Sequence, residues 1–127
     1  MKTNRKGKII IPAEAKPWPH ELNVAHILAK ANCQVEFLLK SNIKTADILL
    51  DGVEYEIKSP EAFNTNTLEH TLKDAAKQAP NLIISTKRIK RIKDAKIKMF
   101  LINQTHKQKQ IKRLLMITKQ NQIIDIK

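Results

Sequence analysis

The sequence predicts an α/β (α+β) domain in which helices flank a mixed central sheet. Two observations support this class: apolar residues recur at helical spacing in some segments and alternate in others, and turn signals separate the short β-type runs. The 127 residues are 42% hydrophobic and 28% charged, which suits one folded domain with one core. We expect residues 1–18 to be an irregular leader and residues 19–127 a single domain, with the order α-β-β-β-α-β-α-β-β.

The first helix is predicted from Pro19 to about Ala31. Proline suits the first turn of a helix because its missing N–H is not needed there. Asn32 is a suitable residue for the C-terminal end. One face of the helix is apolar, with side chains at a spacing of three: Leu22, Ala25, Leu28 and Ala31.

Three strands follow, at residues 34–39, 46–50 and 53–58. Asp51-Gly52 is a strong signal for a two-residue hairpin turn between the second and the third. After Pro60, Asn66 and Glu69 resemble a capping box. The remaining predicted elements are a helix that ends before Pro80, a strand over 82–85, a basic helix from about Ile89 to Arg113, and a hairpin with strands 114–118 and 123–126.

The hairpin turn sets a register that brings two acids together. Asp47 falls opposite Glu56, and facing carboxylates destabilise a sheet. A divalent cation removes that penalty, because Mg²⁺ binds carboxylate oxygens. Lys58 lies on the same face, so the set contains the groups needed to hydrolyse a phosphodiester. The alternative is an exposed sheet face on which Lys58 bridges the two acids. The same alternation points Ala46, Ile48, Leu50, Val53, Tyr55 and Ile57 into a core.

Positive charge is concentrated in the last third of the chain. Residues 84–127 contain 13 Lys/Arg and two acids, whereas residues 1–83 contain 11 Lys/Arg and 10 acids. This distribution indicates a polyanionic partner such as nucleic acid, and the alternative is a solvated lysine-rich surface. Only 4% of residues are aromatic, which favours recognition of a folded RNA by shape. The candidate phosphate contacts are Lys73, Arg88, Lys90, Arg91, Lys93, Lys96 and Lys98, and Thr67 is a further candidate.

Other classes of site and location are disfavoured. Cys33 is the single cysteine, and the four histidines lack zinc-motif spacing, so we expect neither a disulfide framework nor a structural zinc site. Only three isoleucines separate the basic N-terminus from Pro12, which is too short for a secretory signal. No apolar run is long enough to span a bilayer, so we expect no membrane insertion.

A longer pattern adds a resemblance. The segment DILLDGVEYEIK fits D-x8-E-x-K, the signature of the PD-(D/E)xK nuclease superfamily, with Ala46 where a proline often stands. Together with Glu21 in the preceding helix and NTLEHTLKDAAKQAPNLII after the motif, it resembles the C-terminal tRNA-nuclease toxin domain of CdiA-type contact-dependent inhibition proteins. The resemblance spans roughly residues 19–126.

The resemblance implies a restriction-endonuclease-like core and a metal-dependent tRNA nuclease. Asp47 and Glu56 would hold the metal, with Mg²⁺ favoured and Mn²⁺ or Zn²⁺ as alternatives. Lys58 would be the catalytic lysine, and Glu21 and Gln78 would complete the site. Glu21 could instead be an acid that favours the helix dipole, and Gln78 could face solvent.

The resemblance also implies partners and a location. These are a cognate immunity protein and a larger secreted carrier that delivers the domain to act in the cytoplasm of a target cell; otherwise the chain would be cytoplasmic. Two alternatives remain for the activity, a DNA endonuclease of the same fold and a non-catalytic basic nucleic-acid-binding module.

Overall fold

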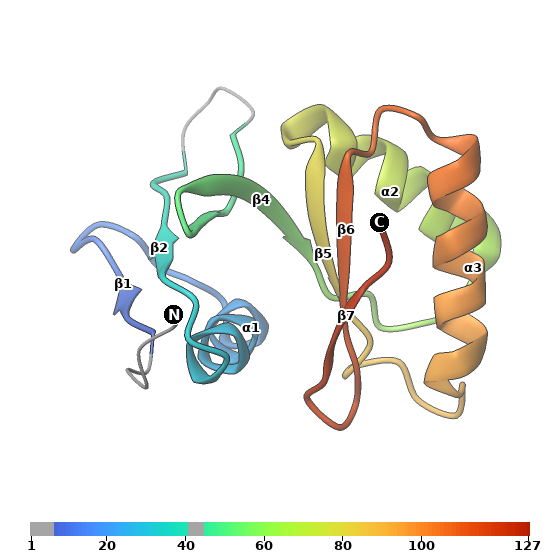
Figure 1. Cartoon of the computed structure of the whole chain (residues 1–127), viewed down its shortest axis with the longest axis horizontal. Helices are drawn as coiled ribbons and strands as arrows, with labels where there is room; N and C mark the ends of the chain where they lie inside the picture. The colour runs from blue at the N-terminus through green and yellow to red at the C-terminus, as the bar shows by residue number, and fades with distance from the viewer. Residues whose placement is uncertain (1–6, 41–44) are drawn as a thin grey trace.

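The computed structural model describes residues 7–40 and 45–127, which form a mixed α+β fold with one curled sheet (Figure 1). In the described residues, seven strands lie in the sheet in sequence order, and three helices pack on it. The elements are β1 (Ile9–Ile10), α1 (Pro19–Lys30), β2 (Val35–Phe37), β3 (Ile48–Leu50), β4 (Val53–Lys58), α2 (Thr65–Gln78), β5 (Asn81–Ser85), α3 (Asp94–Lys107), β6 (Arg113–Ile117) and β7 (Ile123–Asp125).

Strand β4 joins the two halves of the sheet. It pairs antiparallel with β3 on one side and parallel with β5 on the other. In Figure 1 it curves from the half that contains β2 toward the half that contains β5 and β6. The residues at the end of β4 therefore lie where the two halves meet.

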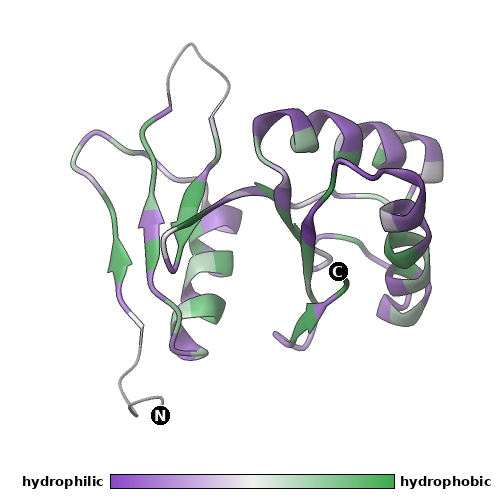
Figure 2. Ribbon diagram, turned by 45° about the horizontal axis from the view of Figure 1, so that its top comes forward, coloured by the Kyte–Doolittle hydropathy of each residue, from purple (hydrophilic) through white to green (hydrophobic). Residues whose placement is uncertain are grey.

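Alternating side chains of the central strands divide the core between two faces. On β5, Ile83 packs with α1 and the first strands, whereas Leu82 and Ile84 pack with α2 and α3. All three side chains are at most 2% exposed, as expected for a parallel strand covered on both faces. The green of the central strands in Figure 2 reflects this apolar composition. Helix α1 thus covers one face, and α2 and α3 cover the other.

The hairpin register is confirmed. Ile48 pairs with Tyr55 and Leu50 with Val53. Asp51 and Gly52 both have positive φ, 48° and 84°, as a tight two-residue turn requires. Of the six side chains predicted to face the core, five are buried. Val53 is the exception, because it lies beside the exposed turn and is 38% exposed.

Two differences concern the ends of elements. Residues 1–18 were predicted as an irregular leader, but Ile9 and Ile10 form β1, parallel to β2. The hydrogen bond from the Val35 N–H to the Lys8 carbonyl, at 2.9 Å, joins the two segments. The cap of α2 lies two residues earlier than predicted, because Asn64 is extended and its side chain accepts from the Thr67 N–H at 3.0 Å.

The predicted basic helix from Ile89 to Arg113 is wrong at both ends, because α3 spans only Asp94–Lys107. Ile89 is 1% exposed, and it reaches the core from an irregular segment. Arg91 in the same segment has a positive φ of 66°, which a helix does not allow. The helical spacing of Ile89 and Ile92 therefore indicates that these side chains face the core, but the backbone there is not helical. None of the helices in the described part of the chain has the length and apolar character needed to cross a membrane.

Candidate active site

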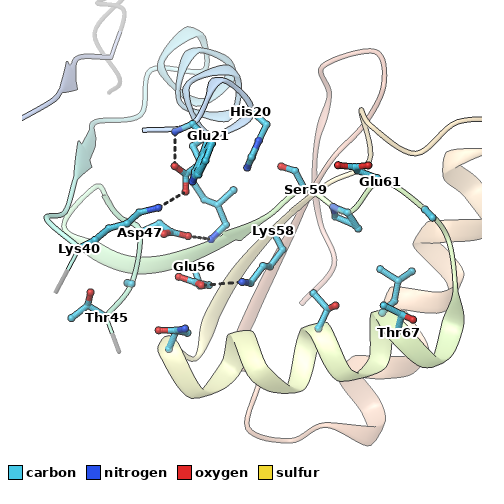
Figure 3. Close-up of a pocket in the computed structure, with 18 of the residues that line it drawn as sticks. His20, Glu21, Lys40, Thr45, Asp47, Glu56, Lys58, Ser59, Glu61 and Thr67 are labelled. Atoms are coloured by element: carbon cyan, nitrogen blue, oxygen red, sulfur yellow. Dashed lines mark hydrogen bonds and ion pairs between the residues drawn. The ribbon is translucent and has the colours of Figure 1, made fainter. Parts of the chain in front are cut away.

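One cavity of about 890 Å³ lies between α1, the end of β4 and α2. All five residues predicted as catalytic line it: Glu21, Asp47, Glu56, Lys58 and Gln78. They come from several parts of the chain. Glu21 lies on α1, Asp47 directly before β3, Glu56 and Lys58 on β4, and Gln78 at the end of α2. Figure 3 shows Asp47, Glu56 and Lys58 close together on one wall, with Glu21 above them.

The Asp47 side chain is held against β4. Its backbone N–H donates to the Tyr55 carbonyl at 3.1 Å, which extends the β3–β4 pairing by one step. Its Oδ2 accepts from the Ile57 N–H at 2.8 Å. This hydrogen bond fixes the Asp47 carboxylate beside Glu56, the residue before Ile57 on β4.

Glu56 is a buried acid in an unfavourable electrostatic environment. It is 4% exposed, and burial together with the negative charge of Asp47 raises the pKa of its carboxyl group to about 8. The positive charge of Lys58, whose Nζ lies 3.5 Å from Glu56 Oε2, lowers the pKa of Glu56 and so opposes part of this shift. Glu56 Oε1 is buried and has no hydrogen-bond partner. An orphaned carboxylate oxygen beside a second carboxylate is the arrangement that a bound cation would satisfy.

The residues present fit a divalent cation. Asp47 and Glu56 are hard oxygen donors, and Mg²⁺ is often held by one or two carboxylates together with water and substrate phosphates. Within the described residues, no group of three or more His, Cys, Asp or Glu side chains could hold a metal. A closed site made entirely of side chains, as in structural zinc centres, is therefore absent from that part of the chain.

Glu21 and Gln78 lie on opposite walls of the cavity. Glu21 is 5% exposed; its Oε1 accepts from the Trp18 N–H at 2.8 Å, and its Oε2 lies 3.8 Å from Lys40 Nζ. Glu21 therefore stabilises the first turn of α1 and also lines the cavity, and its part in the reaction stays a prediction. Gln78, the last residue of α2, is half-buried along the cavity wall.

Lys40 and Ser59 are among the polar residues of this cavity that sequence reasoning missed. Lys40 pairs with Glu21 and brings a second cation to the cavity. Ser59 directly follows Lys58, and its buried Oγ has no hydrogen-bond partner. The position of Ser59 next to the motif was the available signal for it. Lys40 follows an ordinary strand, and the sequence contains no signal for its role.

The predicted nucleic-acid contacts fall into two groups. Thr67 lines the cavity, and Arg88 lies at its edge, where it donates to the Ser59 carbonyl at 3.1 Å and pairs with Glu61. Arg88 therefore holds the segment after β4 in place, and its guanidinium is already partnered. The remaining six do not line the cavity: Lys73, Lys90, Arg91, Lys93 and Lys96 are exposed, and Lys98 is half-buried.

Comparison with protein families identifies the class to which this fold and cavity belong. Residues 44–123 match the model of the contact-dependent growth inhibition CdiA C-terminal domain. The chain therefore belongs to this family and is a CdiA C-terminal toxin domain. Comparison with curated proteins found no match.

A solved structure shares the fold. One chain of a CdiA-CT/CdiI toxin and immunity complex from Burkholderia pseudomallei superimposes with a TM-score of 0.70 at 16% sequence identity. The match covers 94% of this chain and 99% of that chain. The fold is therefore shared over nearly the full length of both.

Proposed function

We propose that this toxin domain is a metal-dependent ribonuclease that hydrolyses phosphodiester bonds of tRNA on a PD-(D/E)xK-type core. The observation that carries the proposal is the position of Asp47, Glu56 and Lys58 on one wall of one cavity. Asp47 and Glu56 would hold the metal, with Mg²⁺ favoured and Mn²⁺ or Zn²⁺ as alternatives. Ionised Glu56 is unfavourable in the folded protein, because its pKa is about 8 and one of its buried oxygens has no hydrogen-bond partner. This supports a role for Glu56 in binding a cation.

Each side chain of the cavity would have a separate role in hydrolysis. When bound, the cation would neutralise the phosphate and promote ionisation of the attacking water. Lys58 places a positive charge at the same wall, where it stabilises the negative charge that develops on the phosphate oxygens. Gln78 lines the same cavity, and its amide would hydrogen-bond the substrate. Glu21 orients Lys40 at the cavity through their ion pair.

The family also suggests partners and a route of delivery. The solved structure with the same fold is a toxin and immunity complex, which supports a cognate immunity protein for this chain. Most of the net positive charge of this chain lies in residues 84–127. That charge favours an immunity protein with acidic residues at the interface. As a CdiA C-terminal domain, the chain would be delivered by a larger protein and act in the cytoplasm of the target cell.

Two other functions use the same structure differently. A DNA endonuclease would need the same acids and the same lysine, so only the substrate separates it from the ribonuclease. A non-catalytic binding module gains nothing from a buried, orphaned acid beside Asp47, because added negative charge weakens binding to nucleic acid.

The test is incubation of the purified protein with total tRNA and, separately, with duplex DNA. Each substrate is treated with Mg²⁺, with Mn²⁺ and with EDTA. We expect tRNA cleavage that requires the metal, with duplex DNA left intact. Cleavage of DNA alone would replace the ribonuclease with an endonuclease. Salt-sensitive binding of tRNA, with neither substrate cut under any condition, would leave the non-catalytic module.

A further inference from the structure

Trp18 is a large exposed aromatic side chain at the wall of the cavity. It is the chain's only tryptophan, and it is 60% exposed although it lines the cavity beside Glu21. The other aromatic residues are used in packing: Phe37 and Tyr55 are at most 5% exposed, and Phe63 meets Phe100 edge to face. The indole therefore presents an open aromatic face at a cavity that Lys40 and Lys58 also line, and a flat ligand can stack on such a face.

The Trp18 ring is held in place by its neighbours. Pro17 and Pro19 flank it and restrict the backbone on both sides. Its backbone N–H donates to Glu21 Oε1 at 2.8 Å. Its ring lies within 6° of parallel to the His20 ring, with centroids 6.3 Å apart. Because the ring is already ordered, a ligand that stacks on it loses little side-chain entropy.

The other side of His20 is also restrained. Its Nδ1 lies 3.5 Å from the Arg88 guanidinium, which in turn contacts Ser59 and Glu61 across the edge of the cavity. The chain of contacts thus runs from Trp18 through His20 and Arg88 to the segment after β4. Trp18, His20 and Lys58 all line the same cavity.

We propose that Trp18, supported by His20, is a stacking platform for one unpaired nucleobase next to the scissile phosphate. This inference rests on the proposed nuclease function and narrows its substrate to a single-stranded loop or end. A flat apolar ring next to lysines suits a nucleotide, because the ring takes the base and the cations take the phosphates. A paired base in a duplex has no free face to offer, so a duplex would not use this platform.

The single tryptophan makes the contact directly measurable. The wild-type protein is titrated in EDTA with a short single-stranded RNA and with an abasic oligoribonucleotide of the same length and charge, while tryptophan fluorescence is recorded. Stacking predicts that the RNA quenches the fluorescence and the abasic chain does not. Equal quenching by both, or quenching by neither, would overturn the proposal.

Binding by variants provides a second measurement that does not depend on fluorescence. Trp18→Ala should weaken binding of the RNA in EDTA by about 5- to 100-fold, and Trp18→Phe should restore most of the affinity. Both variants keep the backbone N–H that caps α1, so the helix is preserved. Val53→Ala, at an exposed apolar side chain on the hairpin tip, is the matched control and should bind normally. Equal affinity for Trp18→Ala and the control would contradict the platform.

Failure of this inference is distinguishable from failure of the nuclease function. All binding measurements are made without metal, so they do not require catalysis. Metal-dependent cleavage with unchanged tryptophan fluorescence would remove the platform and leave the nuclease. Base-dependent quenching with no cleavage in Mg²⁺ or Mn²⁺ would leave the platform and remove the nuclease.

Discussion

At the scale of single residues, Glu56 is a buried acid whose ionisation costs stability. The acid is buried beside Asp47, and burial is the largest cause of its raised pKa. Folding must therefore either keep the proton on this group or compensate its charge. Lys58 supplies part of that compensation from 3.5 Å away, and the proposed cation would supply the rest.

The stability of the metal-free protein should fall with rising pH because of Glu56. Its pKa is about 8 in the folded protein against an ordinary 4.5, so the folded state binds this proton more tightly than the unfolded state. The stabilising contribution is fully present below pH 4.5 and is lost as the pH rises through 8. Urea unfolding in EDTA across this range should show a decline that Glu56→Gln flattens.

Glu54→Gln is the matched control for that experiment. Glu54 lies two residues earlier on the same strand and is exposed, so its replacement should leave the pH dependence unchanged. The same decline in Glu56→Gln as in the wild type would show that another group causes it.

Lys58 should contribute to the rate of cleavage more than to binding. Lys58→Met removes the charge that faces the phosphate, and we expect at least about a 100-fold loss in cleavage rate. Affinity for tRNA in EDTA should change little, because we expect many other cations to contact the phosphate backbone. Lys77→Met, at an exposed lysine paired with Asp74 on α2, should behave like the wild type in both assays. A cleavage rate for Lys58→Met within a few-fold of the control would exclude the catalytic role.

The sequence predicts the proximity of Asp47 and Glu56 because alternation and a two-residue turn define a register. The burial of Glu56 could not be predicted, because it depends on α1 and α2 covering that end of β4. The pairing of Arg88 with Glu61 was equally hidden, since 27 residues separate them in the chain. Short-range patterns thus located the acids, and only the folded structure shows their electrostatic environment.

At the scale of elements, a partly buried interaction of Asp94 holds the start of α3. Its carboxylate accepts from Thr86 Oγ1 at 2.7 Å and from the Lys119 backbone N–H at 2.9 Å, and Lys119 Nζ lies at 2.8 Å. Burial opposes ionisation, but these hydrogen bonds and the Lys119 charge prevail and lower the pKa of Asp94. The interaction ties the helix to the end of β5 and to the β6–β7 turn.

Asp94→Asn should destabilise the domain by about 1.5–3 kcal/mol, because it weakens hydrogen bonds made to a charged group. Urea unfolding at neutral pH measures the change, with Asp125→Asn on exposed β7 as the control. A loss below about 0.5 kcal/mol, the usual range for surface substitutions, would show that the interaction does not hold the helix start.

This interaction also explains why the sequence predicted α3 incorrectly. Ile89 and Ile92 extend the helical spacing of later apolar residues, but they reach the core from the irregular segment before Asp94. Periodicity reports which side chains are buried, and it cannot show where the backbone becomes helical. The strands of the central sheet were predicted more accurately, because turn residues and prolines mark their ends.

At the scale of the whole molecule, the acids of the cavity and most of the net positive charge come from different parts of the chain. The acids of the cavity come from the first half of the chain, and the net positive charge comes from residues 84–127. The segment of residues 86–93 carries the exposed cations Lys90, Arg91 and Lys93 outside the cavity, and its Arg88 is anchored to Ser59 at the cavity edge. We expect this segment to contact the phosphate backbone.

Salt dependence of tRNA binding tests that expectation. Affinity in EDTA should fall linearly with the logarithm of salt concentration, and the double variant Lys90→Gln/Arg91→Gln should reduce the slope by about 2. Lys30→Gln, at the exposed end of α1, should leave the slope unchanged. An unaltered slope in the double variant would place the phosphate contacts elsewhere on the molecule.

The most direct test of the account is tRNA cleavage in Mg²⁺ by Asp47→Asn compared with Asp74→Asn. Asparagine at position 47 retains an oxygen that can accept from the Ile57 N–H, so the hairpin should keep its structure while the carboxylate is lost. Asp74 is exposed on α2, with 72% of its side chain accessible, and serves as the matched control. We expect Asp47→Asn to abolish cleavage and Asp74→Asn to preserve it. Cleavage at the wild-type rate by a folded Asp47→Asn protein would contradict the assignment of this cavity as the active site.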